Sequence, residues 1–376
     1  MIVDVHAHIF KRLGESSVLK DFTAQKMYLQ KAIGNTPATP VRKIKDYKIT
    51  KDFKLWDDKN PGVKGKLDVN LRIGKYGRII WTEKFGDVYV NLFSPSLQEM
   101  EAPPEFILAQ MDMAGIDIAV LQNASLYGQM NNYFSDAVKK YPNRFIGTVQ
   151  VKEIDADKDD QIAKLRRGVE ELGLSGLYFS TTKFFENDFK DHIDDKKFFP
   201  FWEEARSLKI PIFFDIGSPI EPGQNHLSPF ERYSFQMKHF SNWIKTFRDI
   251  PCILVHGVLL GSFCDKDTFV DIPNEIWQIW KSENVFLEIL FPIQVSYPRP
   301  GATAWDYPYI ETRPMIKKLY EKLGAEKLVW GSDIPNSERN CTYKQSLEYL
   351  SRYCTFIPPN AMEKIIGGNA ANLFKI

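Results

Sequence analysis

The chain opens with the stretch Met1-Ile2-Val3-Asp4-Val5-His6-Ala7-His8-Ile9-Phe10, a short apolar run that carries two histidines two residues apart. The apolar residues predict a β-strand, in which side chains at positions i and i+2 point to the same side. We therefore expect Asp4, His6 and His8 on one face, with the two imidazoles converging. Converging imidazoles are typical of a metal site, and the alternative is a coincidental pair on a half-buried strand.

Residues 11–100 interrupt this pattern. They contain 18 lysines and arginines against 10 aspartates and glutamates, a local charge of +8 in a chain whose formal net charge is +1. Alternating runs at 67–73 and 78–83 flank Gly74-Lys75-Tyr76-Gly77, which indicates a hairpin, and a third run follows at 88–93. A connection this long predicts an insertion or lid over an active site, and the alternative is a solvated basic surface.

From Pro103 onward, strand-like runs alternate with amphipathic helical segments, the signature of a parallel sheet. We expect strands at 116–121, 145–151, 176–180, 210–215, 252–256, 284–289 and 327–333, and helical segments such as 160–172, 200–208, 233–247 and 315–323. Together with the first strand these make about eight units, which predicts a (β/α)8 TIM barrel. We expect one domain over 1–376 with 11–100 inserted after the first strand, and helices at 344–353 and 360–374 covering the bottom and flank.

Composition limits the partners. A net charge of +1 and a pI near 7.6 argue against a nucleic acid or a membrane surface, and no run approaches eighteen apolar residues. The four cysteines have no CxxC spacing, so we expect a reducing, cytoplasmic location. A small anionic substrate fits better, because a positive lid would steer it toward a metal.

Functional side chains of such a barrel lie at the carboxyl ends of its strands. Five of those ends carry ionisable residues after an apolar run: His6 and His8 on the first strand, Asp215 on the fifth, His256 on the sixth, Glu288 on the seventh and Asp333 on the eighth. Groups of this kind are costly to bury unless they are paired or bind a cation. Glu288 is expected either to orient a ligand histidine or to form an ion pair inside the barrel.

Five motifs carry a family resemblance: Asp4-Val5-His6-Ala7-His8, Met111-Asp112-Met113-Ala114-Gly115-Ile116, Val255-His256-Gly257, Trp330-Gly331-Ser332-Asp333-Ile334-Pro335 and Gly368-Asn369-Ala370-Ala371-Asn372-Leu373-Phe374. With these motifs in this order and spacing, the chain resembles the amidohydrolase-related (amidohydrolase 2) branch of the amidohydrolase superfamily. That branch includes metal-dependent, non-oxidative decarboxylases of aminocarboxymuconate semialdehyde and of hydroxybenzoate-type acids. The resemblance spans the barrel and leaves residues 11–100 outside it.

The resemblance implies roles for these positions. His6 and His8 would be metal ligands, His256 the catalytic acid or base that contacts substrate, and Asp333 a ligand that also orients a bound water. The family has a histidine ligand on strand five, where this chain reads Pro211-Ile212-Phe213-Phe214-Asp215. We expect Asp215 to substitute as a ligand. The alternatives are another catalytic role for Asp215 and a decayed site.

The resemblance also bears on metal number and reaction. Binuclear members of the superfamily place a carboxylated lysine at the end of strand four, whereas Lys183 falls beyond that end. We therefore expect one divalent ion, zinc by preference and manganese as the alternative. The favoured function is decarboxylation of a small aromatic or unsaturated carboxylic acid. Alternatives are a lactone or amide hydrolase, which two carboxylate ligands disfavour because they weaken the ion's effect on water, and a non-catalytic ligand-binding barrel. The resemblance further implies a homodimer.

Overall fold

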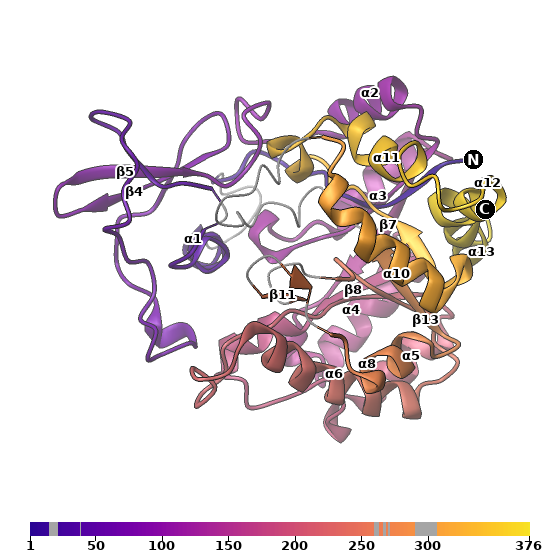
Figure 1. The fold of residues 1–376 in the computed structure, drawn as a ribbon. Helices are drawn as coiled ribbons and strands as arrows, with labels where there is room; N and C mark the ends of the chain where they lie inside the picture. The colour runs from indigo at the N-terminus through magenta and orange to yellow at the C-terminus, as the bar shows by residue number, and fades with distance from the viewer. Residues whose placement is uncertain (15–21, 38, 259–262, 266–267, 270, 290–306) are drawn as a thin grey trace.

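In the computed structural model of the protein, residues 1–14, 22–37, 39–258, 263–265, 268–269, 271–289 and 307–376 are described. Within them, eight parallel strands form one sheet in the order β1-β6-β7-β8-β9-β10-β13-β14. The sheet closes on itself because Ala7 and Ile334 form a parallel bridge and His8 N donates to the carbonyl oxygen of Ile334 at 2.8 Å. The predicted TIM barrel is confirmed (Figure 1).

Each predicted strand lies where the apolar runs placed it. The barrel strands are β1 (Val3–Ala7), β6 (Ile118–Leu121), β7 (Phe145–Gln150), β8 (Gly176–Ser180), β9 (Ile212–Asp215), β10 (Cys252–Leu254), β13 (Val285–Ile289) and β14 (Leu328–Trp330). A short hairpin, β11 (Cys264–Asp265) and β12 (Thr268–Phe269), lies outside this sheet.

Helices separate the strands and cover the barrel. They are α2 (Pro104–Ala114), α3 (Asn131–Lys140), α4 (Asp159–Glu170), α5 (Phe199–Ser207), α6 (Pro229–Thr246), α8 (Asn274–Trp280), α10 (Arg313–Leu323), α11 (Tyr343–Ser351), α12 (Pro359–Glu363) and α13 (Asn369–Phe374). Helix α2 has a proline in its first turn and ends at Gly115, whose φ of 76° is the left-handed conformation that glycine favours.

The sequence predicted a helix over 360–374, and these residues are helical throughout, with one π-helical turn among them. A π-helical turn, Lys364–Gly368, separates α12 from α13. Gly367 lies so close to the start of the chain that a Cβ atom there would be 2.2 Å from the carbonyl oxygen of Met1. Beyond the turn, α13 packs against apolar side chains of the strands through Ala370, Leu373 and Phe374. It therefore closes the end of the barrel opposite the carboxyl ends of the strands.

An irregularity in β1 sets the direction of its polar side chains. The pairing of β1 with β6 shifts by one residue between Asp4 and Ala7, as in a β-bulge. Val3 and Val5 belong to a small apolar cluster formed by residues of several barrel strands. Ala7 belongs to the second, larger core cluster. Because a bulge interrupts the alternation of side chains, the face that Asp4 occupies is not the face of His6 and His8.

Residues 42–91 include a second sheet, separate from the barrel sheet (Figure 1). An antiparallel sheet has the order β2 (Arg42–Lys43), β5 (Gly86–Asn91), β4 (Arg78–Glu83) and β3 (Arg72–Ile73), and the predicted β3–β4 hairpin is present. Helix α1 (Phe22–Ile33) precedes this sheet. Leu29, Trp56, Trp81 and Val90 are buried in a core that continues into the barrel.

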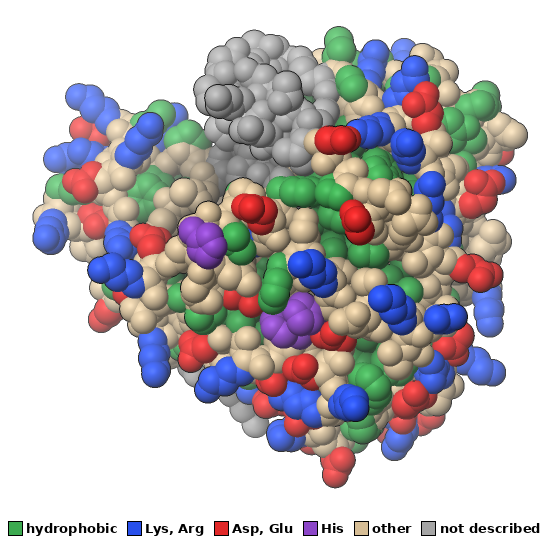
Figure 2. Space-filling model, turned by 60° about the horizontal axis from the view of Figure 1, so that its bottom comes forward, with side chains coloured by type: hydrophobic (Ala, Val, Ile, Leu, Met, Phe, Trp, Pro, Cys, Tyr) green, Lys and Arg blue, Asp and Glu red, His purple; other side chains and the backbone are tan. Residues whose placement is uncertain are grey.

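The surface shows no large region of one charge on the face seen in Figure 2, where acidic and basic side chains alternate. None of the helices in the described residues combines the length and apolar character needed to cross a bilayer.

Candidate active site

The two histidines of β1 converge as predicted. Their Nε2 atoms lie 3.1 Å apart, and both rings are buried. Each Nδ1 atom faces an oxygen: Nδ1 of His6 lies 2.9 Å from Oε1 of Glu288, and Nδ1 of His8 lies 2.8 Å from the carbonyl oxygen of Gln122. When each Nδ1 donates its hydrogen to that oxygen, each Nε2 presents a lone pair to the same point.

Asp333 supplies the third donor. Its Oδ1 atom lies 2.8 Å from Nε2 of His8 and 3.6 Å from Nε2 of His6. Its backbone N donates to the carbonyl oxygen of His6 at 2.7 Å, which fixes the residue against β1 where the barrel closes. Asn336 donates to the same carboxylate oxygen at 2.8 Å and to the hydroxyl of Tyr127 at 2.9 Å.

These three residues fit a divalent cation. Within the described residues they form the one group of potential ligand atoms that lie within 4.8 Å of one another. A tetrahedral ion with bonds near 2.1 Å needs donors about 3.4 Å apart, which the separations of 2.8, 3.1 and 3.6 Å bracket. Burial would lower the pKa of His6, but Glu288 and Asp333 outweigh it and raise that pKa to about 9. The position therefore attracts positive charge.

Glu288 joins the candidate metal site to His256. One carboxylate oxygen accepts from Nδ1 of His6, and the other accepts from the backbone N of His256 at 2.6 Å. The contact fits both roles expected from the sequence, a carboxylate that orients a ligand histidine and an ion pair inside the barrel. Gly331 lies against this carboxylate and must be glycine, because a Cβ atom there would lie 1.9 Å from Oε1 of Glu288.

His256 and Asp215 form a second pair. Nδ1 of His256 lies 3.4 Å from Oδ1 of Asp215, and the two imidazoles of His6 and His256 are 5.2 Å apart between ring centroids. The other oxygen of Asp215 accepts from the hydroxyls of Ser180 at 2.8 Å and Tyr178 at 3.0 Å. Ser180 is the residue that pairs with Asp215 between β8 and β9, so strand register fixes this contact.

The pair shifts the pKa of both members. Burial lowers the pKa of His256, but the Asp215 carboxylate outweighs it and holds that pKa above its ordinary value. Burial raises the pKa of Asp215, but His256 and the two hydroxyls outweigh it and lower that pKa to about 2. The geometry thus favours an imidazolium beside a carboxylate.

Asp4 does not join the histidines, and the prediction of a shared face is wrong for this residue. Its oxygens accept from the backbone N atoms of His6 and Ser332, both at 2.9 Å, and from the hydroxyl of Tyr343 on α11 at 2.6 Å. The β1 irregularity turns Asp4 away from the site. It instead ties β1 to the segment that presents Asp333.

The structure therefore brings His6, His8 and Asp333 together and places Asp215 with His256, outside that donor group. That Asp215 is a ligand stays a prediction. Sequence reasoning did not find Tyr178 and Ser180, although their i, i+2 spacing at the end of a predicted strand was a usable signal. It also did not find Asn336, which follows Asp333 by three residues.

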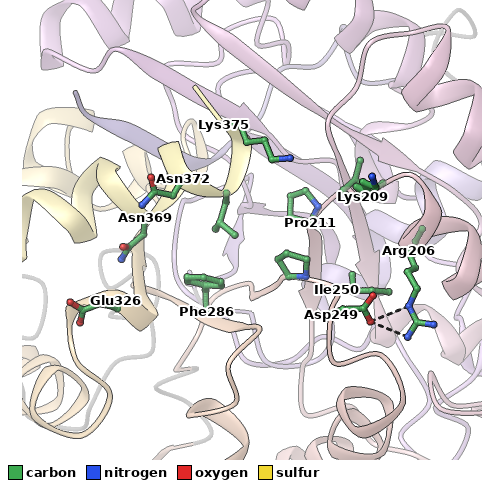
Figure 3. Close-up of a pocket in the computed structure, with 14 residues that line it drawn as sticks. Arg206, Lys209, Pro211, Asp249, Ile250, Phe286, Glu326, Asn369, Asn372 and Lys375 are labelled. Carbon is green, nitrogen blue, oxygen red and sulfur yellow. Dashed lines mark hydrogen bonds and ion pairs between the residues drawn. The ribbon is translucent and has the colours of Figure 1, made fainter.

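Two cavities lie at opposite ends of the strands. One of about 490 Å³ is lined by Tyr178, Ser180, Lys183 and Asp215 and also by α1 residues, so it adjoins the His256–Asp215 pair. The other, about 700 Å³, lies at the amino ends of β9 and β10 and contains none of the predicted site residues (Figure 3). Its Arg206 is paired with Asp249 at 3.0 Å. Because functional residues of a TIM barrel lie at the carboxyl ends of its strands, the cavity of about 490 Å³ is the candidate substrate pocket.

Comparison with known proteins found one family model and several solved structures. A family model described as amidohydrolase matches residues 3–376. A search of curated proteins found no match.

Solved structures with the same fold include three with described activities. A dihydroxybenzoic acid decarboxylase from a Polaromonas species, with bound manganese and the inhibitor 2-nitroresorcinol, is 17% identical, with a TM-score of 0.53 over 73% of this chain and 87% of that one. A 2,6-dihydroxybenzoate decarboxylase from Rhizobium is 16% identical, with a TM-score of 0.52 over 73% and 89%. A probable 2-pyrone-4,6-dicarboxylic acid hydrolase from Acinetobacter baumannii, with citric acid bound, is 16% identical, with a TM-score of 0.51 over 74% and 91%. At these identities the likeness shows the fold.

Proposed function

The chain belongs to the amidohydrolase family, and from that premise we propose that it is a metal-dependent, non-oxidative decarboxylase of a small aromatic or unsaturated carboxylic acid. The family match confirms the expectation of an amidohydrolase-superfamily enzyme. The reaction is inferred from the arrangement of its side chains.

The observation that carries the proposal is the contact between His256 and Asp215. A carboxylate beside an imidazole favours the protonated ring, and Asp215 offsets the opposing charge of a cation bound nearby. Protonated His256 is suited to donate a proton. Decarboxylation by protonation of carbon needs such a general acid, whereas hydrolysis needs a base that removes a proton from water.

His6, His8 and Asp333 would hold the divalent ion, which supplies binding and polarisation of the substrate carboxylate or an adjacent oxygen. Asp215 holds Nδ1 of His256, so Nε2 is the atom that delivers the proton to the carbon bearing the carboxylate. The bond between that carbon and the carboxylate then breaks. The electron pair of this bond stays with the protonated carbon, and CO₂ leaves. His256 regains its proton from solvent.

Zinc and manganese both suit two imidazoles and one carboxylate. Zinc is the ion favoured from the sequence, and the structure of the Polaromonas decarboxylase contains manganese. Metal analysis of the purified protein should therefore measure both ions.

Hydrolysis of a lactone or amide is the second candidate function. With Asp215 outside the donor group, a bound ion would meet one carboxylate, and the charge argument against activating water loses its basis. The Acinetobacter protein, a probable hydrolase with a similar fold, supports this second candidate. A non-catalytic barrel is the third, and a metal content far below one ion per chain would favour it.

A product assay separates these functions. The manganese- or zinc-loaded protein is incubated with 2,6-dihydroxybenzoate, 5-carboxyvanillate and 2-pyrone-4,6-dicarboxylate in isotopically labelled water. We expect release of CO₂ and an organic product that has lost one carboxylate and contains no labelled oxygen. A ring-opened product that contains labelled oxygen would establish the hydrolase instead.

We also propose that residues 11–100 act as the lid over the site, since Tyr28, Lys31 and Ala32 of α1 line the cavity beside Asp215. A homodimer and a cytoplasmic location remain proposals. The free thiols of Cys252, Cys341 and Cys354 are consistent with a reducing compartment. Sedimentation of the purified protein tests the dimer, and localisation of a tagged chain tests the compartment.

A further inference from the structure

Tyr127 brings a hydroxyl group to the candidate metal site from the loop after β6. It ends the short helix Ser125–Tyr127, and β6 is the neighbour of β1 in the barrel. The centroid of its ring lies 5.0 Å from that of His8. Tyr127 is 2% exposed and His8 is 4% exposed, so the tyrosine is buried as deeply as the histidine beside it.

One amide group joins this hydroxyl to the third proposed ligand. Nδ2 of Asn336 donates to the hydroxyl oxygen of Tyr127 at 2.9 Å and to Oδ1 of Asp333 at 2.8 Å. An amide nitrogen carries two hydrogens, so both contacts can form at once. The same Oδ1 atom lies 2.8 Å from Nε2 of His8. The hydroxyl therefore lies close to the atoms that would bind the ion.

The hydrogen of this hydroxyl has no acceptor among the described residues. A phenol has one hydrogen to donate and keeps it at neutral pH. Its oxygen accepts from Asn336, and Tyr127 donates to no atom of the described ranges. Because a buried donor without an acceptor is costly, a ligand oxygen that accepts this hydrogen would be bound favourably.

Packing fixes the direction of the Tyr127 ring. It stacks on Phe10 with a centroid distance of 4.4 Å and an angle of 12° between the planes, and the ring of Phe93 lies 6.2 Å away. The backbone of the loop is held as well, because Gln25 of α1 donates to the carbonyl oxygen of Leu126 at 3.0 Å. The donor is preorganised, so a ligand that uses it need not order the side chain.

We propose that the hydroxyl of Tyr127 donates its hydrogen bond to the substrate oxygen that binds the metal ion. This inference rests on the proposed function and adds a residue that contacts substrate but is neither a metal ligand nor the proton donor. The hydrogen bond would stabilise negative charge on that oxygen and fix the orientation of the group that carries it. His256 still delivers the proton to carbon.

A binding titration tests this contact without measuring turnover. The probe is salicylate, a fluorescent aromatic acid whose carboxylate and adjacent hydroxyl can both bind a divalent ion. Its affinity for the zinc- or manganese-loaded protein is compared between wild type and Tyr127→Phe, which keeps the ring that stacks on Phe10. We expect salicylate to bind the variant at least about ten-fold more weakly, in the range for a hydrogen bond to a charged group.

Metal affinity separates a contact with substrate from a structural role. Asn336 can still donate to Asp333 in Tyr127→Phe, so competition with a chelator should give a metal affinity within about two-fold of wild type. The matched control is Tyr233→Phe on α6, because Tyr233 is also 2% exposed but packs against Phe263 instead of a site residue. This control should bind both metal and salicylate as wild type does.

The outcomes separate this inference from the proposed function. Equal salicylate affinities of wild type and Tyr127→Phe, or no salicylate binding by wild type, would overturn the inference. An equal loss of metal and salicylate affinity would also overturn it, because the hydroxyl would then act only by holding Asn336 against Asp333. If salicylate binding depends on Tyr127 but no acid tested releases CO₂, the contact stands and the decarboxylase proposal fails.

Discussion

Oδ1 of Asp215 lies 3.4 Å from Nδ1 of His256; Asp215 is the last residue of β9, and His256 follows the neighbouring strand β10. The hydroxyls of Ser180 and Tyr178 hold the other oxygen of the aspartate toward β8. The residue that replaces the histidine expected on strand five is thus engaged on both oxygens. Its charge acts on the proposed acid, and the group that could hold a metal ion consists of His6, His8 and Asp333.

Asp215→Asn should separate catalysis from metal binding. The amide keeps the size of the side chain but removes the charge that favours the protonated form of His256. We expect kcat to fall about 100-fold, in the range for a general acid, with metal content unchanged. Elemental analysis and steady-state kinetics measure the two quantities.

The control for that variant is His8→Ala, which should lose the metal and the activity together. A loss of metal from Asp215→Asn comparable with that from His8→Ala would restore Asp215 to the ligand set, as the sequence first suggested.

Glu288→Gln should weaken metal binding without unfolding the protein. The carboxylate that orients His6 becomes a neutral amide, and partners of this kind typically contribute about 10- to 100-fold in metal affinity. Competition with a chelator measures the change. Glu153→Gln is the matched control, since Glu153 is also a buried glutamate but contacts none of the proposed ligands.

Asp4→Asn should destabilise the closure of the barrel. Asp4 accepts hydrogen bonds from His6 N, Ser332 N and the hydroxyl of Tyr343, and an amide nitrogen in place of one oxygen would face these donors. We expect the free energy of unfolding to fall by about 2–3 kcal/mol, whereas Tyr343→Phe, which removes one bond, should cost about 1 kcal/mol. Urea denaturation measures both, and a smaller loss for Asp4→Asn than for Tyr343→Phe would contradict this role.

Glu153 should make stability depend on pH. Burial raises the pKa of Glu153 to about 7, against the opposing effect of Lys183, so the folded protein holds a proton that the unfolded chain releases near pH 4.5. The stability due to this group is complete below pH 4.5 and is lost as the pH rises through 7. Glu153→Gln should therefore stabilise the protein relative to wild type by a margin that grows over this interval, to at most about 3 kcal/mol.

Denaturation of the wild type and Glu153→Gln at pH values on both sides of this window tests the sign. The glutamine keeps an oxygen that can accept from the backbone N of Ser180, so the comparison isolates the charge. A margin that shrinks as the pH rises would show that the carboxylate is paired more strongly than it is desolvated.

The sequence by itself determined the barrel and the residues at its mouth. Apolar runs of strand length separated by helical segments leave few ways to bury both faces of a parallel sheet, and closure gathers the strand ends at one rim. His6, His8, His256, Glu288 and Asp333 could be named because each is an ionisable residue after an apolar run.

Only the tertiary structure decided which of these side chains meet. A one-residue shift in the pairing of β1 turned Asp4 away from the histidines, and the register of β8 against β9 gave Asp215 to Ser180 and His256. Lys31 reached the cavity from an inserted helix whose position no local pattern specifies. The physical reason is that periodicity fixes the direction of a side chain within its own element, whereas register and packing between distant elements fix its partners.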